Sequence, residues 1–484
     1  MTPSELLRLD ASTLSRRIAA RDISCRELMQ ASLDRIAALN PQYNAIVSLR
    51  PAEALLEEAD AADAALARGE HRGWMHGFPL AVKDLSHAAG LPTSMGSPLA
   101  PRSASKVDSL HVARARSAGA IVIGKTNTPE FGLGSHTYNT VFGKTLNAYQ
   151  PTLSAGGSSG GAAVALALGM LPVADGSDMG GSLRNPAAFN NVIGFRPSRG
   201  RVPGSPDDEL FMQQLGCEGP MARTVEDAAR LLAVQAGFDD RVPLSLQDKL
   251  PSPDTLQLEG DVKGLRIGWL GSVWPDLPLA PGVRELCEHA LQTFHDLGCT
   301  VEPHQLDVPR DQNWTAWLRL RQLLVGGKLG AAFADSALRE KLKPEAQWEV
   351  EQSFQLDAAA LYQASLYRSN VYRAFVRAFE SFDFVVAPTA QVFPFDAKLA
   401  WPAQVGDVQS DTYHRWMEIV TPFTLAGLPT LNVRAGFGEG GLPMGLQIAG
   451  PIHRDLAVLR LGDAYDKACG WGAIRPSALD ELPT

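Results

Sequence analysis

Two glycine-rich clusters that carry serine hydroxyls lie close together in this chain. They are residues 154–161, SAGGSSGG, and residues 176–185, GSDMGGSLRN. Glycine has no Cβ, so its backbone can approach a ligand closely and adopt turns with φ > 0. A serine in such a stretch is a hydroxyl among bare backbone N–H groups, as acyl transfer requires: a nucleophile, and donors directed at the oxyanion it creates. The apolar run AAVALALGMLPVA between the clusters argues against a flexible linker.

Other short catalytic motifs fit this region poorly. Neither cluster ends in the GK[ST] of a phosphate-binding loop. Residues 156–160 match the GxSxG nucleophile elbow, but that motif needs a strand running directly into the serine, and here the proline-containing segment YQPTLS precedes it. Ser103 and Lys106 match the SxxK pattern of β-lactamases, yet they lie in a Pro/Ser-rich segment with no KTG motif after it.

A serine nucleophile needs a general base, and the histidines offer no shared pattern. His111 and His136 are two of ten histidines, and no HExxH zinc motif occurs. Lys83 is the remaining candidate, because it ends the apolar run 78–82, where loss of solvation lowers the pKa of an amine. A lysine at a strand end is more commonly a solvated charge, so this assignment depends on a companion motif.

Helices and short buried strands alternate along the chain and would position these residues. The first 70 residues are expected to be helical, with a Ser24/Glu27 capping box, a helix that extends to Pro41 and an alanine-rich helix over 52–68. We expect further helices at 110–118, 160–170, after Thr224 and at 282–297, a mostly helical segment over 312–380, and strands at 78–84, 120–127, 171–174, 265–271, 382–390, 429–437 and 443–451. The alternation indicates βαβ units and a parallel or mixed sheet.

The overall composition excludes several classes of function. The chain has 484 residues, 45% of them hydrophobic, and a net charge of −9 without a basic cluster. This argues against nucleic acid and an anionic membrane surface as partners. We see neither a secretory signal nor an apolar stretch long enough to span a bilayer. The five scattered cysteines form no CxxC pair and support neither a zinc site nor a disulfide framework, so we expect a cytoplasmic enzyme.

Several motifs occur together in one order and spacing, and they supply the companion that Lys83 needs. They are GFPLAVKD, GKTNTPEFG, AGGSSGGAAVALA, GSDMGGSLRNPA, GPMARTVEDAA and AGLPTLNV followed by GLPMGLQIAGP. Together they resemble the amidase signature family over residues 60–240 and 380–470. The resemblance implies an α/β fold, a three-layer α/β/α sandwich with a large mixed central sheet. We expect an N-terminal helical segment over 1–70 that packs on the core, and a signature domain over 71–475 with a helical insertion at 312–380.

The resemblance also implies a Ser-cisSer-Lys triad. Lys83 of AVKD matches the base, Ser158 of GGSSGG the bridging serine and Ser182 of DMGGS the nucleophile. The family pattern makes the first serine of the Ser158/Ser159 pair catalytic, and it makes the Gly157–Ser158 peptide cis. The backbone N–H groups expected to hold the oxyanion belong to Met179, Gly180, Gly181 and Ser182.

Supporting and specificity residues follow from the same resemblance. Asp178 and Arg184 are expected to shape the loop through hydrogen bonds and an ion pair, although Arg184 could instead bind a substrate carboxylate. Met179 stands where the family often has threonine and would bring a flexible apolar side chain to the acyl pocket. Phe131 and Trp416 are further pocket candidates. Asn432 replaces a frequent serine, and we expect this change to be neutral.

The function implied is hydrolysis of a carboxylic amide C–N bond through an acyl-enzyme, with no metal or cofactor and a small-molecule amide as substrate. A carbamate, ester or aryl-anilide hydrolase with the same triad is one alternative. The A subunit of a tRNA-dependent amidotransferase is another, although residues 412–429, TYHRWMEIVTPFTLAGLP, resemble stand-alone amidases more. A homodimer is left open, and the sequence does not name the substrate.

Overall fold

An eight-stranded sheet forms the centre of the protein. A computed structural model describes residues 1–206 and 209–480. The strand order is β10-β9-β11-β15-β14-β7-β8-β6. The bounds, in that order, are Thr300–Pro303, Arg266–Trp269, Phe384–Pro388, Pro443–Ala449, Thr430–Phe437, Ile193–Arg196, Cys217–Ala222 and Val173–Asp178. β10, β9 and β11 run parallel to one another, and the other neighbouring pairs are antiparallel. The sheet is therefore mixed, as the sequence predicts.

A smaller sheet continues the fold beyond the β6 edge. Its order is β1-β3-β2, with bounds Ile46–Val47, Ile121–Thr126 and Pro79–Lys83. β2 and β3 are parallel, because α5 (Leu110–Ser117) returns the chain between them. β2 lies against β6, although the two strands belong to different sheets. The side chain of Asp175 on β6 bridges this seam by accepting the backbone N–H of Lys83 on β2.

Helices cover both faces of the central sheet. On β14 the side chains of Leu431 and Val433 face Gly462 of α16, whereas Asn432 lies on the other face together with Ala188 of α7. α6 packs with α7, and α8 and α10 pack with α16. The bounds are Gly160–Ala167 for α6, Arg184–Phe189 for α7, Val225–Gln235 for α8, Val283–Ala290 for α9, Gln292–Asp296 for α10 and Asp455–Cys469 for α16. The arrangement is the predicted α/β/α sandwich.

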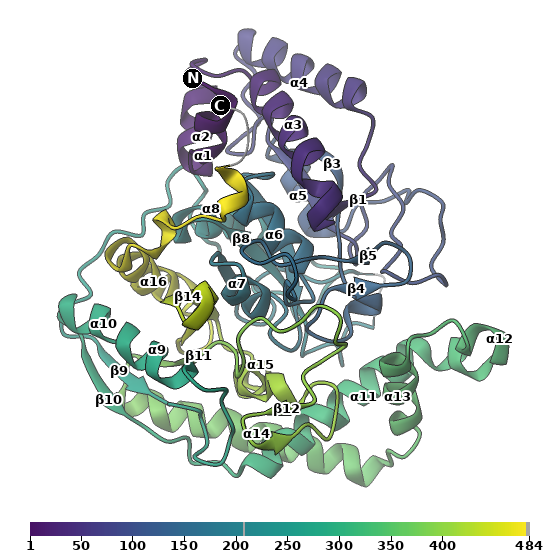
Figure 1. Cartoon of the computed structure of the whole chain (residues 1–484), viewed down its shortest axis with the longest axis vertical. Helices are drawn as coiled ribbons and strands as arrows, with labels where there is room; N and C mark the ends of the chain where they lie inside the picture. The colour runs from purple at the N-terminus through teal and green to yellow at the C-terminus, as the bar shows by residue number, and fades with distance from the viewer. Residues whose placement is uncertain (207–208, 481–484) are drawn as a thin grey trace.

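The N-terminal helices and the long later helices lie at opposite ends of the molecule (Figure 1). At one end are α1 to α4, with bounds Pro3–Arg8, Ala11–Ala19, Cys25–Tyr43 and Ala52–Ala67. At the other are α11 (Arg310–Ala334), α13 (Pro344–Ser353) and α14 (Ala358–Ser381), with α12 (Ser336–Arg339) between α11 and α13. The segment 312–380 is thus mostly helical, as expected. The division of the chain into an N-terminal segment over 1–70 and a signature domain over 71–475 stays a prediction.

Short elements complete the described chain. They are β4 (Tyr138–Asn139), β5 (Gly143–Lys144), β12 (Gln404–Val405), β13 (Val408–Gln409), α15 (Thr421–Ala426) and the 3₁₀ turns η1 (Glu130–Gly132), η2 (Arg415–Val420), η3 (Glu439–Gly441), η4 (Trp471–Ala473) and η5 (Ser477–Leu479). No helix within residues 1–206 and 209–480 is long and apolar enough to cross a membrane. All five cysteines are free thiols.

The predicted end of one helix and the predicted bounds of one strand are wrong. The Ser24/Glu27 capping box is present, but the helix it starts continues past Pro41 to Tyr43 and stops at Asn44, whose φ is +50°. The strand expected at 171–174 instead spans Val173–Asp178 and includes the first residues of the second glycine cluster. Pairing along its whole length with β8 overrides the low strand propensity of glycine and aspartate.

A buried carboxylate ties the N-terminal helices to the sandwich. Asp227 on α8 accepts the backbone N–H groups of Ala11 and Ser12 at 2.9 and 2.8 Å and the Ser12 hydroxyl at 2.7 Å. Thr224 caps α8 through the Asp227 N–H, as the sequence predicts. The first residues of α2 therefore find their hydrogen-bond acceptor 216 positions away in the chain.

We predict that Asp227→Ala lowers the free energy of unfolding by about 1–3 kcal/mol, because buried N–H donors lose their acceptor. Denaturant unfolding followed by circular dichroism measures the change. The exposed Asp240→Ala is the matched control and is expected to stay within about 0.5 kcal/mol of the parent. Equal decreases in the free energy of unfolding of the two variants would contradict the role of Asp227 in holding α2 to the sandwich.

Candidate active site

Lys83 lies at the end of β2 with its amine fully buried among hydroxyl groups. Its Nζ donates to the Oγ atoms of Ser158 and Ser159, both at 2.8 Å, and to Ser177 Oγ at 2.9 Å. The Ser177 carbonyl lies 3.3 Å from Nζ. A hydroxyl can donate or accept, so these partners satisfy the amine whether it is charged or neutral.

Burial and the nearby carboxylates have opposite effects on the pKa of Lys83. Burial lowers the pKa of the amine to about 8, and the negative charges of Glu218, Asp175 and Asp178 oppose this shift. The residue is therefore not a solvated charge at a strand end. At neutral pH most of the amine is therefore protonated, and roughly a tenth of it is neutral and able to accept a proton.

The first glycine cluster is held in an unusual backbone conformation. The Gly157–Ser158 peptide is cis, and Gly156 has φ +71° with the backbone of Pro186 close to where a Cβ would stand. Thr137 donates its hydroxyl to the Gly156 carbonyl at 2.8 Å, and Ser135 donates to the Gly157 carbonyl at 2.5 Å. These hydrogen bonds fix the carbonyl of the cis peptide and the carbonyl of the peptide that precedes it.

Geometry separates the two serines that contact Lys83. Ser158 lines a cavity, whereas Ser159 is fully buried and its Oγ lies 3.4 Å from the backbone of Ser177 on β6. Ser159 also donates its N–H to the Ser182 carbonyl at 3.2 Å. Of this pair, Ser158 therefore lies between the lysine and the cavity.

Ser182 occupies the loop between β6 and α7 and lines the same cavity as Ser158. Its exposed fraction is 8%, against 2% for Ser158 and 0% for Lys83. This gradient of exposure follows the order expected for a nucleophile, a bridge and a base. Gly181 precedes Ser182 with φ +85°, and a Cβ there would come within 2.8 Å of Val420 and Asn185. The turn that presents the hydroxyl thus requires glycine at this position.

One of the four expected oxyanion donors is already engaged. The N–H of Gly181 donates to Asp178 Oδ1 at 3.0 Å, which corrects the expectation that it faces the substrate. No acceptor within the described ranges of the chain takes the N–H of Met179, Gly180 or Ser182. Three donors therefore remain for an oxyanion, and the fourth organises the loop.

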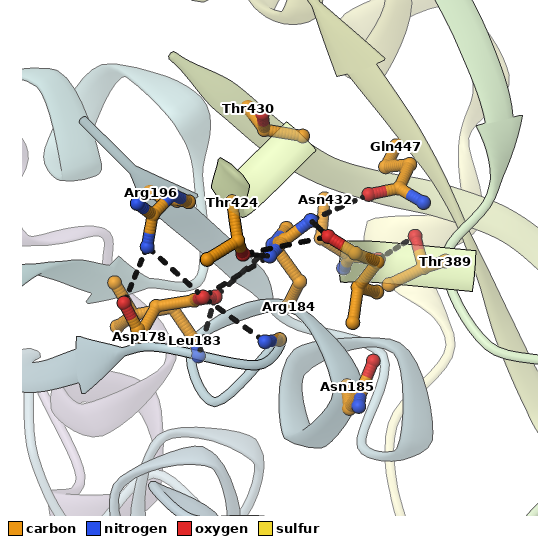
Figure 2. A network of polar contacts seen from close by, with 12 residues as sticks. Asp178, Leu183, Arg184, Asn185, Arg196, Thr389, Thr424, Thr430, Asn432 and Gln447 are labelled. Atoms are coloured by element: carbon orange, nitrogen blue, oxygen red, sulfur yellow. Dashed lines mark hydrogen bonds and ion pairs between the residues drawn. The ribbon is translucent and has the colours of Figure 1, made fainter. Parts of the chain in front are cut away.

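Asp178 and Arg184 form a buried network behind this loop (Figure 2). Asp178 accepts two hydrogen bonds at 3.0 Å from Arg184 and lies 3.3 Å from Arg196. Burial would raise the pKa of Asp178, but the charges of Arg184 and Arg196 outweigh it and lower the pKa. Arg184 also donates to Gln447 and Thr424 and is fully buried, so it does not reach a substrate carboxylate.

The cavity in front of the two serines has a volume of about 280 Å³. Phe131 and Met179 line it, as expected. Trp416 is buried instead, with its ring against Phe189 and Phe395 and its N–H donated to the Tyr413 carbonyl. Its neighbour Met417, at a break in η2, lines the cavity in its place. The pocket assignment of Trp416 is therefore wrong by one residue.

One wall of the cavity comes from α11, which lies outside the motifs recognised in the sequence. Leu324, Val325 and Leu329 supply apolar side chains there. Arg321 is held by Glu349 at 2.6 Å and by the Tyr413 hydroxyl at 2.8 Å, and its Nη1 lies 3.4 Å from Met179 Sδ. The helical segment therefore contacts the catalytic loop through a side chain that sequence reasoning did not single out.

Sequence reasoning missed several other residues at the site. Ser177 stands in the second cluster without a predicted role, and its Oγ and carbonyl both contact the lysine. Asp175 lies just beyond the predicted strand, and the extension of β6 places it beside Lys83. The histidines His111 and His136 are buried and hydrogen-bonded, and His136 holds Ser154 at 2.7 Å. The SxxK match at residues 103–106 is largely exposed and lies outside the cavity.

The chain matches one protein family and is similar to curated proteins of one kind. The family model described as Amidase matches residues 27–459. The A subunit of glutamyl-tRNA(Gln) amidotransferase from Acidothermus cellulolyticus is 35% identical, with 96% of this chain and 95% of that protein covered. Its counterpart from Thermosynechococcus vestitus is 33% identical, with 96% and 98% covered.

Solved structures resemble this one over nearly its whole length. A bacterial aryl acylamidase of the amidase signature enzymes has a TM-score of 0.89 at 29% identity, with 98% of this chain and 99% of that chain covered. The A subunit of glutamyl-tRNA(Gln) amidotransferase from Thermotoga maritima has a TM-score of 0.76 at 26% identity, with 96% and 95% covered. By its family match, its relatives and its fold, this chain belongs to the amidase signature family and is an amide hydrolase.

Proposed function

We propose that Lys83, Ser158 and Ser182 form a Ser-cisSer-Lys triad that hydrolyses a carboxylic amide through an acyl-enzyme. The observation that carries the proposal is the buried Lys83 amine, 2.8 Å from Ser158 Oγ, with Ser158 and Ser182 lining one cavity. A relay of this kind needs no histidine, because a hydroxyl passes the proton from nucleophile to base.

The reaction proceeds in two halves. Neutral Lys83 takes the Ser158 proton while Ser158 takes the Ser182 proton, and Ser182 Oγ forms a bond to the amide carbonyl carbon. The relay then returns a proton to the nitrogen, the C–N bond breaks, and amine or ammonia leaves. Water, deprotonated by the same relay, attacks the ester carbonyl and releases the acid and the free Ser182 hydroxyl. Lys83 ends each half neutral, so the cycle closes.

The oxyanion of each tetrahedral intermediate is stabilised by the N–H groups of Met179, Gly180 and Ser182. Support comes from the N–H of Gly181 being taken by Asp178, which fixes the orientation of the peptides beside it. Such a preorganised donor contributes about 3–4 kcal/mol to the transition state in comparable sites. The Asp178–Arg184 pair thus acts on the reaction by holding the loop.

We predict that Ser182→Ala and Lys83→Ala each reduce turnover about 10³-fold or more, because the variants lack the nucleophile or the base. Steady-state hydrolysis of an amide substrate measures the loss. Ser103→Ala and Lys106→Ala are matched controls, since both side chains are exposed and outside the cavity, and they should retain parent activity. More than about 1% residual turnover in either triad variant would refute the assignment.

We predict that activity rises with pH and levels off near the pKa of Lys83, about 8. Only the neutral amine accepts a proton, so kcat/KM should increase about tenfold per pH unit on the acid side of this value. A pH series of kcat/KM, with circular dichroism at each pH to show that the fold persists, measures the profile. A rate that declines steadily above neutrality in folded protein would argue against a lysine base.

A second candidate function is that of the A subunit of a glutamyl-tRNA(Gln) amidotransferase. The curated relatives favour it more directly than a stand-alone amidase, because 35% identity extends over 96% of the chain. The aryl acylamidase structure, with the higher TM-score, supports the stand-alone function. The same triad would serve both, and a carbamate, ester or aryl-anilide hydrolase with this triad stays an alternative. A cytoplasmic location and a homodimer stay predictions.

The purified chain alone distinguishes the two candidates. A stand-alone amidase is expected to hydrolyse simple aliphatic, aryl or peptide amides in the absence of a partner or tRNA, because the site is complete within one chain. Release of amine or ammonia from a panel of amides, with Ser182→Ala as the blank, is the measurement. Turnover confined to glutamine, and only after addition of the partner proteins of an amidotransferase, would establish the second candidate instead.

A further inference from the structure

Asp175 and His111 form a buried pair directly behind the Lys83 base. Asp175 accepts the Lys83 backbone N–H with both carboxylate oxygens, at 3.1 and 3.3 Å. His111 Nε2 on α5 lies 3.4 Å from Asp175 Oδ2. Each side chain is only 3% exposed. Neither residue lines the cavity that holds Ser158 and Ser182, so the pair reaches the chemistry through Lys83.

The pair sits at the seam between the two sheets. β2 carries Lys83 and β6 carries Asp175, and the two strands have no ladder pairing with each other in the described chain. The Asp175 carboxylate therefore replaces a backbone acceptor at the residue whose side chain is the base. A neutral amide at this position could accept the same N–H, so hydrogen bonding alone does not require a charge.

The charged groups that face Lys83 come from β6 and β8. Glu218, Asp175 and Asp178 each raise the pKa of the amine, against the dominant effect of burial, and the Cys217 thiol adds a smaller effect in the same direction. The three carboxylates do not stand alone, because Arg184 and Arg196 neutralise Asp178. Asp175 instead faces the imidazole of His111, which is positively charged when protonated.

The charge of His111 depends on the same group of residues. Burial disfavours the protonated ring, but the hydrogen bond to Asp175 and the charges of Glu218 and Asp175 outweigh burial, and Lys125 opposes them. The pKa of His111 is raised as a result. A proton on His111 cancels part of the negative charge that Asp175 presents to Lys83.

We propose that Asp175 and His111 are positioning residues for the amidase reaction: Asp175 holds the Lys83 backbone and lends negative charge to its amine, and His111 sets how much of that charge the amine experiences. This inference rests on Lys83 being the general base. Removing the two partners changes the field at the amine in opposite directions, which a purely structural role would not do.

The test compares pH profiles of kcat/KM for Asp175→Asn and His111→Gln with the parent. Asp175→Asn removes a negative charge, lowers the pKa of Lys83, and should move the midpoint to lower pH by about half a unit or more. His111→Gln removes the positive charge that the protonated imidazole places beside Asp175, and it should move the midpoint to higher pH by a smaller amount. The matched control is Asp227→Asn. Asp227 is another buried aspartate that accepts backbone N–H groups, but it does not line the cavity and is not among the charges that act on Lys83, so the midpoint should stay in place.

The outcomes separate this inference from the triad itself. Midpoints that move in opposite directions in Asp175→Asn and His111→Gln support the roles proposed for these two residues. Shifts in one direction, or uniformly lower kcat at an unmoved midpoint in folded variants, overturn it while leaving the triad intact. If Lys83→Ala keeps its activity, the proposed triad fails, and that result is independent of the pair variants. If Asp175→Asn does not fold, His111→Gln and His111→Asn still decide, because they leave the hydrogen bond from Lys83 to Asp175 untouched.

Discussion

The burial of the Lys83 amine is the constraint on which the site depends. A fully buried ammonium is costly unless it is paired, and direct pairing with a carboxylate would hold the proton too firmly for a base. The structure avoids both problems by surrounding Nζ with hydroxyls from Ser158, Ser159 and Ser177 and keeping the carboxylates further away. Hydroxyls satisfy either protonation state, so the lysine can give and take a proton without leaving an unpaired group.

The two glycine clusters are coupled through buried hydrogen bonds. Asn185, which follows the nucleophile loop, donates to Ser135 Oγ at 2.9 Å, and Ser135 donates to the Gly157 carbonyl at the cis peptide. Asp178 holds the other side of the loop through the N–H groups of Gly181 and Leu183. Glycine gives the backbone its unusual shape, and buried polar side chains outside the reaction make that shape unique.

The sequence predicted most of the elements and the residues that meet at the site, because both leave local signals. Apolar runs and glycine clusters marked the regions that hold Lys83, Ser158 and Ser182, and the resemblance to the family singled out the individual residues. The misses have a common physical cause: they depend on partners distant in sequence. Strand β6 extends to Asp178 only because β8 pairs with it, and the N–H of Gly181 is taken by a carboxylate that the loop must fold back to reach. Met417 lines the cavity instead of Trp416, because η2 is broken at Met417 and this side chain faces the cavity.

Met179 contributes its backbone to the proposed oxyanion site and its side chain to the cavity wall. The same side chain contacts Arg321 of α11. The catalytic backbone is fixed by Asp178 from behind, so the side chain in front is free to vary without moving the donor. The apolar wall from α11 lies outside the motifs shared with the family. A chain of this kind can therefore keep one reaction and change its acyl pocket, because the two depend on different atoms of the same residue.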